Sequence, residues 1–324
     1  MSVRIDRRQF LKAAAITSGA IGVGVAWPRG VHQPSAHAGS VNDCLVGGNS
    51  NFISTEVPNL GQTLSVERIY KRWGEELFTA DVVASADAGR KLAMSVFPSS
   101  SGLDRRWADI ASGKYDADIK DMAGQFKAFG ATHDRKIGLA FNHEPENDRD
   151  ASLGEIHLGN EADFRGAFQH FFSVLKTQGV TNILRTIILM GSSYNSGAAD
   201  SYWPGSTYVD RLGVDCYNWF GSAQQPDGQW RSFQQIVQGA NNYAVAKDRR
   251  LWVCETATLE DPNDGQRKAQ WITDMGATIK SMPKIRVLMY FEGARNGWWL
   301  AQSPQGSPAA LSSFKALLAD PYFV

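Results

Sequence analysis

Eight short apolar runs, rich in β-branched residues, recur along the chain, and their spacing constrains the fold more than any other feature of the sequence. Successive runs are far enough apart for a loop and a helix to fit between them. Most are apolar throughout rather than alternating, as expected of strands that helices cover on both faces. The predicted strands are 44–48, 68–73, 91–97, 136–141, 186–190, 209–217, 250–254 and 285–291.

Helical periodicity is clearest in 161–178, where phenylalanines repeat at a spacing of three to four and Gly179 follows as a stop signal. Similar patterns predict helices over 115–129, 232–247 and 265–281. Alternating strands and helices that end at eight strands predict an α/β fold, the (β/α)8 or TIM barrel, as a single domain over 39–324. An open doubly wound sheet is the alternative, but no strand is followed by a glycine-rich dinucleotide turn.

Residues 1–38 predict a signal peptide that is removed on export. Arg7 and Arg8 resemble the twin-arginine export signal, 13–26 form a mildly apolar run, and Ala36-His37-Ala38 is a small-x-small cleavage site. The apolar run is shorter than the roughly 20 residues that span a bilayer. We therefore expect a secreted, extracellular protein with no membrane partner after cleavage.

The charge balance indicates which partners to expect. Residues 1–38 carry five basic side chains and one acidic one, so their removal takes the net charge from zero to minus four. An acidic chain without a basic run argues against nucleic acid as a partner. We expect the mature protein to be a monomer.

Three cysteines, Cys44, Cys216 and Cys254, are too few for a disulfide framework, and their spacing matches no zinc ribbon. At most one bridge can form, and whether one does is left open. We expect buried thiols that act as small hydrophobic side chains. Strand alternation predicts that Cys216 and Cys254 point toward the helices.

Polar and aromatic residues gather just after the predicted strands, which is where barrel enzymes carry their active sites. Asn142, His143 and Glu144 follow the fourth strand, Tyr217 lies at the end of the sixth, and Glu255 follows the seventh. A single glutamate after an apolar strand is usually a solvated loop residue. Two of them across one barrel mouth predict a pair of cooperating carboxyl groups.

Cleavage of a glycosidic bond requires such a pair, with one protonated and one ionised carboxyl group. His143 and Pro145 crowd Glu144, so this residue is the candidate acid. Glu255 is the candidate nucleophile, with the phenol of Tyr217 within reach from the neighbouring strand.

Four segments resemble glycoside hydrolase family 26, whose best-known members are endo-β-mannanases. They are Asn142 to Asn147, Val253 to Glu255, Tyr202 to Gly205, and Tyr208 to Asn218. The resemblance implies that Glu144 is the acid/base, with His143 as its positioning neighbour. It also implies that Glu255 is the nucleophile and that Tyr217 orients it.

Two departures from the family pattern concern the sugar rather than the mechanism. Pro145-Glu146 stands where the mannanases commonly have Met-Asn, and the fifth strand ends in Gly191 to Asn195 without the usual Trp and Pro. Residues near these turns shape the sugar subsites, so the identity of the sugar stays open.

Aromatic rings at the strand ends are candidate platforms for the apolar faces of sugar rings. The predicted substrate-binding residues are Trp73, Asn142, Trp219, Trp298 and Trp299, with the last pair closest to the reacting sugar. His143-Glu144 lacks the second histidine of a zinc protease motif, so neither a metal nor another cofactor is expected.

Together these features predict a retaining endo-glycoside hydrolase that acts on a β-linked polysaccharide, with β-1,4-mannan as the first candidate. Its two carboxyl groups are expected to lie about 5 to 5.5 Å apart, whereas a separation of about 9 Å would indicate an inverting enzyme. The same mechanism on a β-glucan, a β-xylan or a cell-wall glycan is an alternative. A barrel that binds carbohydrate without cleaving it is another.

Overall fold

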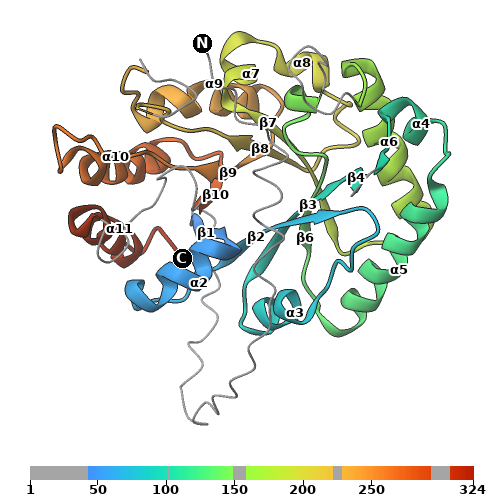
Figure 1. The fold of residues 1–324 in the computed structure, drawn as a ribbon, viewed down its shortest axis with the longest axis horizontal. Helices are drawn as coiled ribbons and strands as arrows, with labels where there is room; N and C mark the ends of the chain where they lie inside the picture. Colours follow the sequence, from blue (N-terminus) through green and yellow to red (C-terminus); the bar gives the residue numbers. More distant parts are fainter. Residues whose placement is uncertain (1–42, 101–102, 149–157, 222–227, 293–306) are drawn as a thin grey trace, which may run out of the picture.

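The computed structural model describes residues 43–100, 103–148, 158–221, 228–292 and 307–324. Within them, eight parallel strands close into a barrel in the order β1-β10-β9-β8-β7-β6-β3-β2 (Figure 1). The strands are β1 (Leu45–Asn49), β2 (Val66–Arg72), β3 (Lys91–Phe97), β6 (Ile137–Phe141), β7 (Ile183–Met190), β8 (Arg211–Asp215), β9 (Arg250–Thr256) and β10 (Ile285–Tyr290). Each overlaps one of the predicted runs, so the prediction of a (β/α)8 barrel is confirmed.

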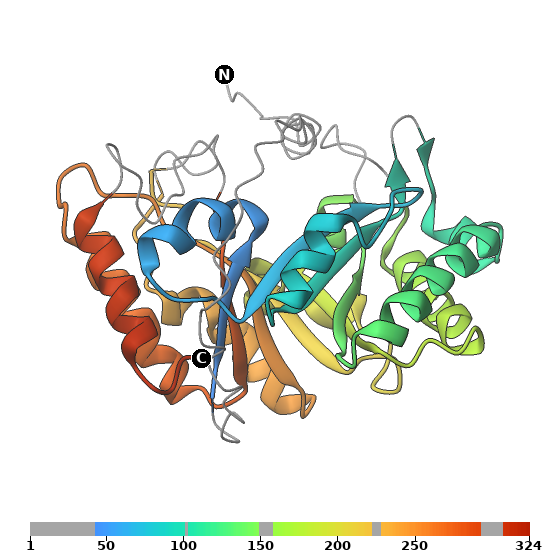
Figure 2. The same ribbon diagram turned by 90° about the horizontal axis from the view of Figure 1, so that it is seen from below.

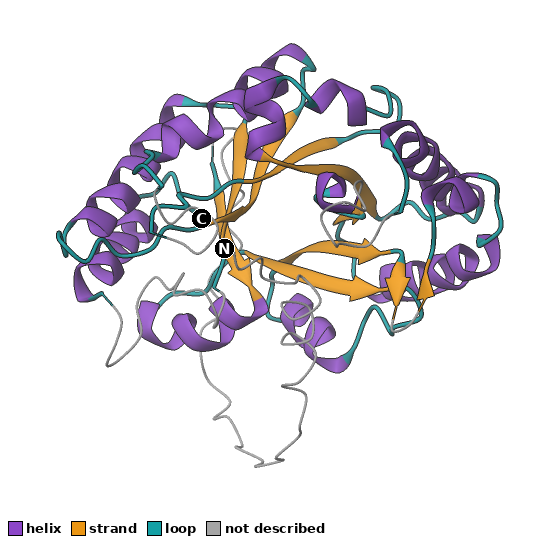
Figure 3. Ribbon diagram, turned by 45° about the horizontal axis from the view of Figure 1, so that its top comes forward, coloured by secondary structure: helices purple, strands orange, loops and turns teal. Residues whose placement is uncertain are grey.

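Helices surround the barrel on its outside (Figures 2 and 3). The four predicted helices are α5 (Asp116–Thr132), α6 (Glu161–Thr177), α9 (Phe233–Ala246) and α10 (Arg267–Ser281). At the start of α6, the Asn160 side chain accepts from backbone N–H groups and Asp163 reaches back to the Asn160 N–H, which forms a capping box.

Several shorter elements were not predicted. They are α2 (Ser50–Leu60), α3 (Ala80–Asp87), α4 (Trp107–Ala111), η1 (Pro145–Asp148), α7 (Gly191–Ser196), α8 (Ala199–Tyr202), α11 (Pro308–Ala319), and a hairpin of β4 (Ser99–Ser100) and β5 (Leu103–Asp104). Most span too few turns for an apolar period to be recognised. None of the helices in the described part of the chain is long and apolar enough to cross a membrane.

The inside of the barrel is packed with side chains. A buried cluster there consists of Val66, Ala93, Ala140, Ile188, Trp252, Cys254, Val287 and Met289. Trp252 occupies the space beside Gly138, where an added Cβ would lie 2.2 Å from the indole ring. The C-terminal residues complete the wall beside β1, since the Val46 N–H donates to the Val324 carbonyl at 2.8 Å.

The three cysteines are buried and free, as expected of small hydrophobic side chains. The predicted direction of Cys254 is wrong, because its side chain belongs to the inner cluster. The register between β8 and β9 shifts here: Val214 pairs with Val253, but Asp215 pairs with Glu255. Such a β-bulge re-aims the residue that follows it. Cys254 faces the barrel interior because it alternates in step with Trp252 of the same cluster, and the bulge turns Glu255, the next residue, toward the mouth.

Candidate active site

Glu255 lies at the C-terminal end of β9 with only 6% of its surface exposed. The Tyr70 hydroxyl, from β2, donates to Oε1 of Glu255 at 2.6 Å. The Tyr217 hydroxyl, just after β8, donates to Oε2. Burial and then the charge of Glu255 raise the pKa of both phenols well above the ordinary value, so both remain protonated donors. Each carboxylate oxygen is thereby held by a separate strand.

Arg68 places a positive charge beneath this carboxylate. Its Nη2 lies 3.7 Å from Oε1 of Glu255, and its guanidinium sits 4.5 Å from the centroid of the Tyr70 ring. Burial lowers the pKa of Arg68, whereas Tyr70, Glu255 and Asp215 raise it. The net result is a pKa above the ordinary value for arginine. The guanidinium therefore stays charged inside the barrel. Arg68 and Tyr70 were not among the predicted site residues. They lie two and four positions after Val66 of the inner cluster, so the alternation of side chains along β2 turns both toward the barrel interior.

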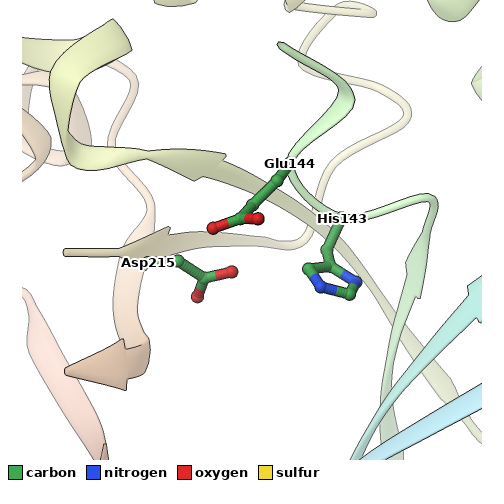
Figure 4. Close-up of side chains that lie close together, drawn as sticks. All are labelled: His143, Glu144 and Asp215. Atoms are coloured by element: carbon green, nitrogen blue, oxygen red, sulfur yellow. The ribbon is translucent and has the colours of Figure 1, made fainter. Parts of the chain in front are cut away.

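Glu144 follows β6 in a strained turn. Its φ of +48° and the φ of +46° at Asn142 lie in the left-handed region, which non-glycine residues seldom occupy. The Glu144 N–H donates to the Ile188 carbonyl of β7 at 3.0 Å, and Nδ2 of Asn147 donates to its Oε2 at 3.0 Å. The half-buried carboxyl group projects toward Asp215, with the His143 ring beside it (Figure 4).

Asp215, the last residue of β8, is a third carboxyl group that the predicted site did not include. It is 2% exposed, and among the described residues neither of its oxygens has a hydrogen-bond partner. Burial, and then the charges of Glu255 and Glu144, raise its pKa well above the ordinary value, although Arg68 opposes this shift. A polar residue at the end of an apolar strand was the signal that could have identified it.

His143, Glu144 and Asp215 each offer a donor atom, and these atoms lie within 4.8 Å of one another. Three such groups could hold a cation. In the metal-free protein the pKa of Asp215 is raised, so a cation bound there would have to displace a proton from this carboxyl group. The prediction that catalysis needs no metal stays a prediction.

His143 lies beside both proposed catalytic carboxyl groups. It precedes Glu144 in the chain, and its Nε2 is 3.9 Å from Oε1 of Glu255. The ring is 5% exposed and packs edge-on against Phe97, with 4.7 Å between the centroids. The ring is therefore near Glu255 of β9 as well as next to Glu144 in the chain, and its positioning role stays a prediction.

Trp73 and Asn142 do not reach the mouth, so their prediction as substrate-binding residues is wrong. Trp73 is 1% exposed, and its ring stacks on Phe171 of α6 at 6.1 Å, so it has no free face for a sugar. Asn142 is fully buried. It accepts from Nε1 of Trp107 at 3.2 Å and donates to Asp148 at 2.7 Å, so it holds the turn that carries Glu144.

Trp219 is half-buried beside the Tyr217 ring, with 5.1 Å between the centroids, and it stays a candidate sugar platform. Trp298 and Trp299 lie outside the described residues. The site as described therefore consists of the carboxyl groups, their phenol and guanidinium neighbours, His143 and one tryptophan.

A barrel with acidic groups gathered at its C-terminal mouth is an architecture that glycoside hydrolases use. Solved structures similar to this chain include the catalytic domain of a GH26 endo-β-1,4-mannanase from Bacillus sp. JAMB-750, with a TM-score of 0.65 and 14% identity over 87% of each chain. A GH26 β-mannanase from Bacteroides ovatus gives a TM-score of 0.62 and 14% identity, over 87% of this chain and 90% of that one. The resemblance to family 26 is thus confirmed in the fold.

Sequence comparison gives a different relative. Endoglucanase H of Acetivibrio thermocellus is 29% identical over 211 residues, which are 64% of this chain. The matched region spans 22% of that protein, so this chain corresponds to about a fifth of it. No protein-family model matches the chain.

Proposed function

We propose that this protein is a retaining endo-β-glycoside hydrolase in which Glu255 is the nucleophile and Glu144 the acid/base. The observation that carries the proposal is the environment of Glu255. Two phenols donate to its oxygens, and Arg68 lies beneath them. Such surroundings stabilise an anion and hold it in one orientation, as attack on an anomeric carbon requires.

In the first step, a Glu255 oxygen forms a bond to the anomeric carbon while the bond to the glycosidic oxygen breaks. Glu144 gives its proton to that oxygen, and the leaving sugar departs with a hydroxyl group. In the second step, Glu144 takes a proton from water, and the water oxygen displaces Glu255 from the anomeric carbon. Two inversions retain the β configuration.

Asp215 has a separate role in this scheme. Its raised pKa keeps a proton on a carboxyl group that lies close to Glu144 and has no protein partner among the described residues. A buried acid of this kind can donate a hydrogen bond to a sugar hydroxyl next to the reacting carbon. A hydrogen bond from Asp215 to a substrate hydroxyl would offset part of the free energy that burying this unpaired carboxyl group costs.

The substrate has two candidates. Two structural neighbours are β-mannanases, which supports β-1,4-mannan. The higher sequence identity belongs to a protein named endoglucanase, and it favours a β-glucan. The missing Trp and Pro at the end of β7 agree with a departure from mannan.

The test is a screen of the mature protein on mannan, glucomannan, lichenan and xylan, with the anomer of the first product followed by NMR. Release of β-anomer from mannan or lichenan supports the proposal and decides between the two sugars. First release of α-anomer would replace the retaining mechanism with an inverting one. Tight binding without any product would leave a carbohydrate-binding barrel.

We also propose that residues 1–38 direct export and are removed, and that the mature protein is a secreted monomer. The paired Arg7 and Arg8 and the cleavage site before Gly39 support this. Replacing both arginines with lysine should stop secretion, and N-terminal sequencing of the wild-type product should start near Gly39. Light scattering of the mature protein should give the mass of one chain.

A further inference from the structure

The N-terminal ends of the strands, opposite the candidate active site, carry a group of basic side chains. Lys91, Arg211 and Arg250 are the first residues of β3, β8 and β9. Lys91 lies two positions before Ala93, and Arg250 lies two positions before Trp252. Ala93 and Trp252 belong to the cluster inside the barrel. Because side chains of a strand alternate, the basic groups converge on the lower mouth of the barrel.

None of these three cations forms an ion pair within 4 Å among the described residues. Among the described residues, the side chains of Lys91 and Arg250 have no hydrogen-bond or ion-pair partner, and Arg211 donates only to the Asp210 carbonyl, at 2.7 Å. Burial, and then Arg135, Arg250 and Arg211, lower the pKa of Lys91. Burial and then the charge of Arg250 likewise lower the pKa of Arg211, although the charge of Asp210 opposes this shift. The cations are thus close enough to repel one another.

A cavity of about 500 Å³ opens beside Arg211 and Arg250, which both line it. Its lining includes five cationic and two acidic side chains, and both acids already have partners. Asp210 accepts from Arg185 at 2.8 and 2.9 Å, and Asp248 accepts from Lys284 at 2.6 Å. Asp210 also attracts Arg211 but is shared with Arg185, and Arg250 has no ion-pair partner among the described residues, so the lining keeps an excess of positive charge.

We propose that this cavity binds a small multivalent oxyanion of the phosphate class. Guanidinium groups donate in a planar fork that matches two oxygens of a phosphate, and Arg211 and Arg250 both line the cavity. An anion there would relieve the repulsion that these cations place on the folded state. The site is independent of the glycosidase proposal, since it lies at the other end of the strands.

The experiment measures thermal unfolding of the mature protein in pyrophosphate, with potassium chloride at equal ionic strength as the reference. Wild type should gain roughly 5 °C in Tm at a hundredfold excess over Kd. The double variant Arg211→Gln/Arg250→Gln should lose this gain and should melt higher than wild type without the anion. Lys120→Gln/Lys127→Gln, which removes two exposed charges from α5, is the matched control and should behave as wild type.

The proposal would be overturned if pyrophosphate raised the Tm of wild type, the double variant and the control equally. It would also be overturned if the Tm of wild type in pyrophosphate were no higher than in potassium chloride. Calorimetry should also give one bound ion per chain for wild type and none for the double variant. A further arm uses glycerol 1-phosphate. A gain similar to that in pyrophosphate identifies a site open to phosphate esters, and a gain with inorganic ions alone identifies a free ion as the ligand.

Discussion

Tyr70 donates a hydrogen bond of 2.6 Å to Oε1 of Glu255, although 185 positions separate the two residues in the chain. The partner strands β2 and β9 are not neighbours in the barrel, so the bond crosses its mouth. Tyr217 holds the other oxygen from β8. The orientation of the proposed nucleophile therefore depends on the closed barrel and not on any local segment.

Tyr70→Phe and Tyr217→Phe should each lower kcat/KM about 10- to 150-fold. A hydrogen bond to a charged group contributes roughly 1.5 to 3 kcal/mol, and its loss frees the carboxylate to rotate. Steady-state kinetics on the substrate found in the screen measures the effect. Tyr208→Phe, away from the mouth, is the control. Full activity in Tyr70→Phe would show that one phenol suffices to hold Glu255.

Glu144→Gln should lower turnover about 10²- to 10⁴-fold, because it removes the general acid. Glu255→Gln should lower it about 10⁴-fold or more, because it removes the nucleophile. Circular dichroism should show both variants folded, and Glu76→Gln, an exposed glutamate, should remain fully active. Normal turnover in either site variant would mean that the chosen carboxylate is not catalytic.

Asp215 should make stability depend on pH. Its pKa in the folded protein is raised, so the folded state keeps a proton that the unfolded chain has already lost. Stability from this group is complete below the ordinary aspartate pKa, near pH 4, and is lost as pH rises through the raised value. Asp215→Asn should remove this slope. Urea unfolding of both proteins across pH tests it, and parallel curves would contradict the prediction.

Gly138→Ala should destabilise the barrel by about 1 to 3 kcal/mol, because the new methyl group meets the Trp252 ring in a packed interior. Gly124→Ala is the matched control: its Cβ would meet nothing within 4 Å on α5. That change should stabilise the protein by roughly 0.4 to 1 kcal/mol. Chemical denaturation measures both, and equal effects would show that the contact with Trp252 relaxes at no cost.

Trp219→Ala should raise KM about 2- to 12-fold with little change in kcat, since an aromatic stacking contact contributes roughly 0.5 to 1.5 kcal/mol. Trp219→Phe should retain most of the binding. A fall in kcat with KM unchanged would assign Trp219 to support of the Tyr217 ring beside it and not to sugar binding.

Strand positions and helix periods could be read from the sequence because burial imposes a local pattern. Eight apolar runs and four amphipathic segments were sufficient to predict the barrel. Strand ends also placed Glu144, Glu255 and Tyr217 at one mouth, since parallel strands all end at the same face. The short helices and the hairpin carried too little periodicity to be seen.

Exposure at the mouth could not be read in the same way. Trp73 and Asn142 stand next to strand ends, as Trp219 does, yet packing against α6 and the turn near Asp148 buries the first two. Tyr70, Arg68 and Asp215 join the site through contacts across the barrel. The β-bulge at Cys254 decides where Glu255 points.

The sequence by itself determined the number and order of the strands and which segments carry acidic groups, because these follow from local patterns of burial. Only the tertiary structure decided which side chains meet, how Glu255 is held and where the basic groups converge. Closure of the barrel brings together residues that are far apart in the chain, and their distances and shared charge exist only after that closure.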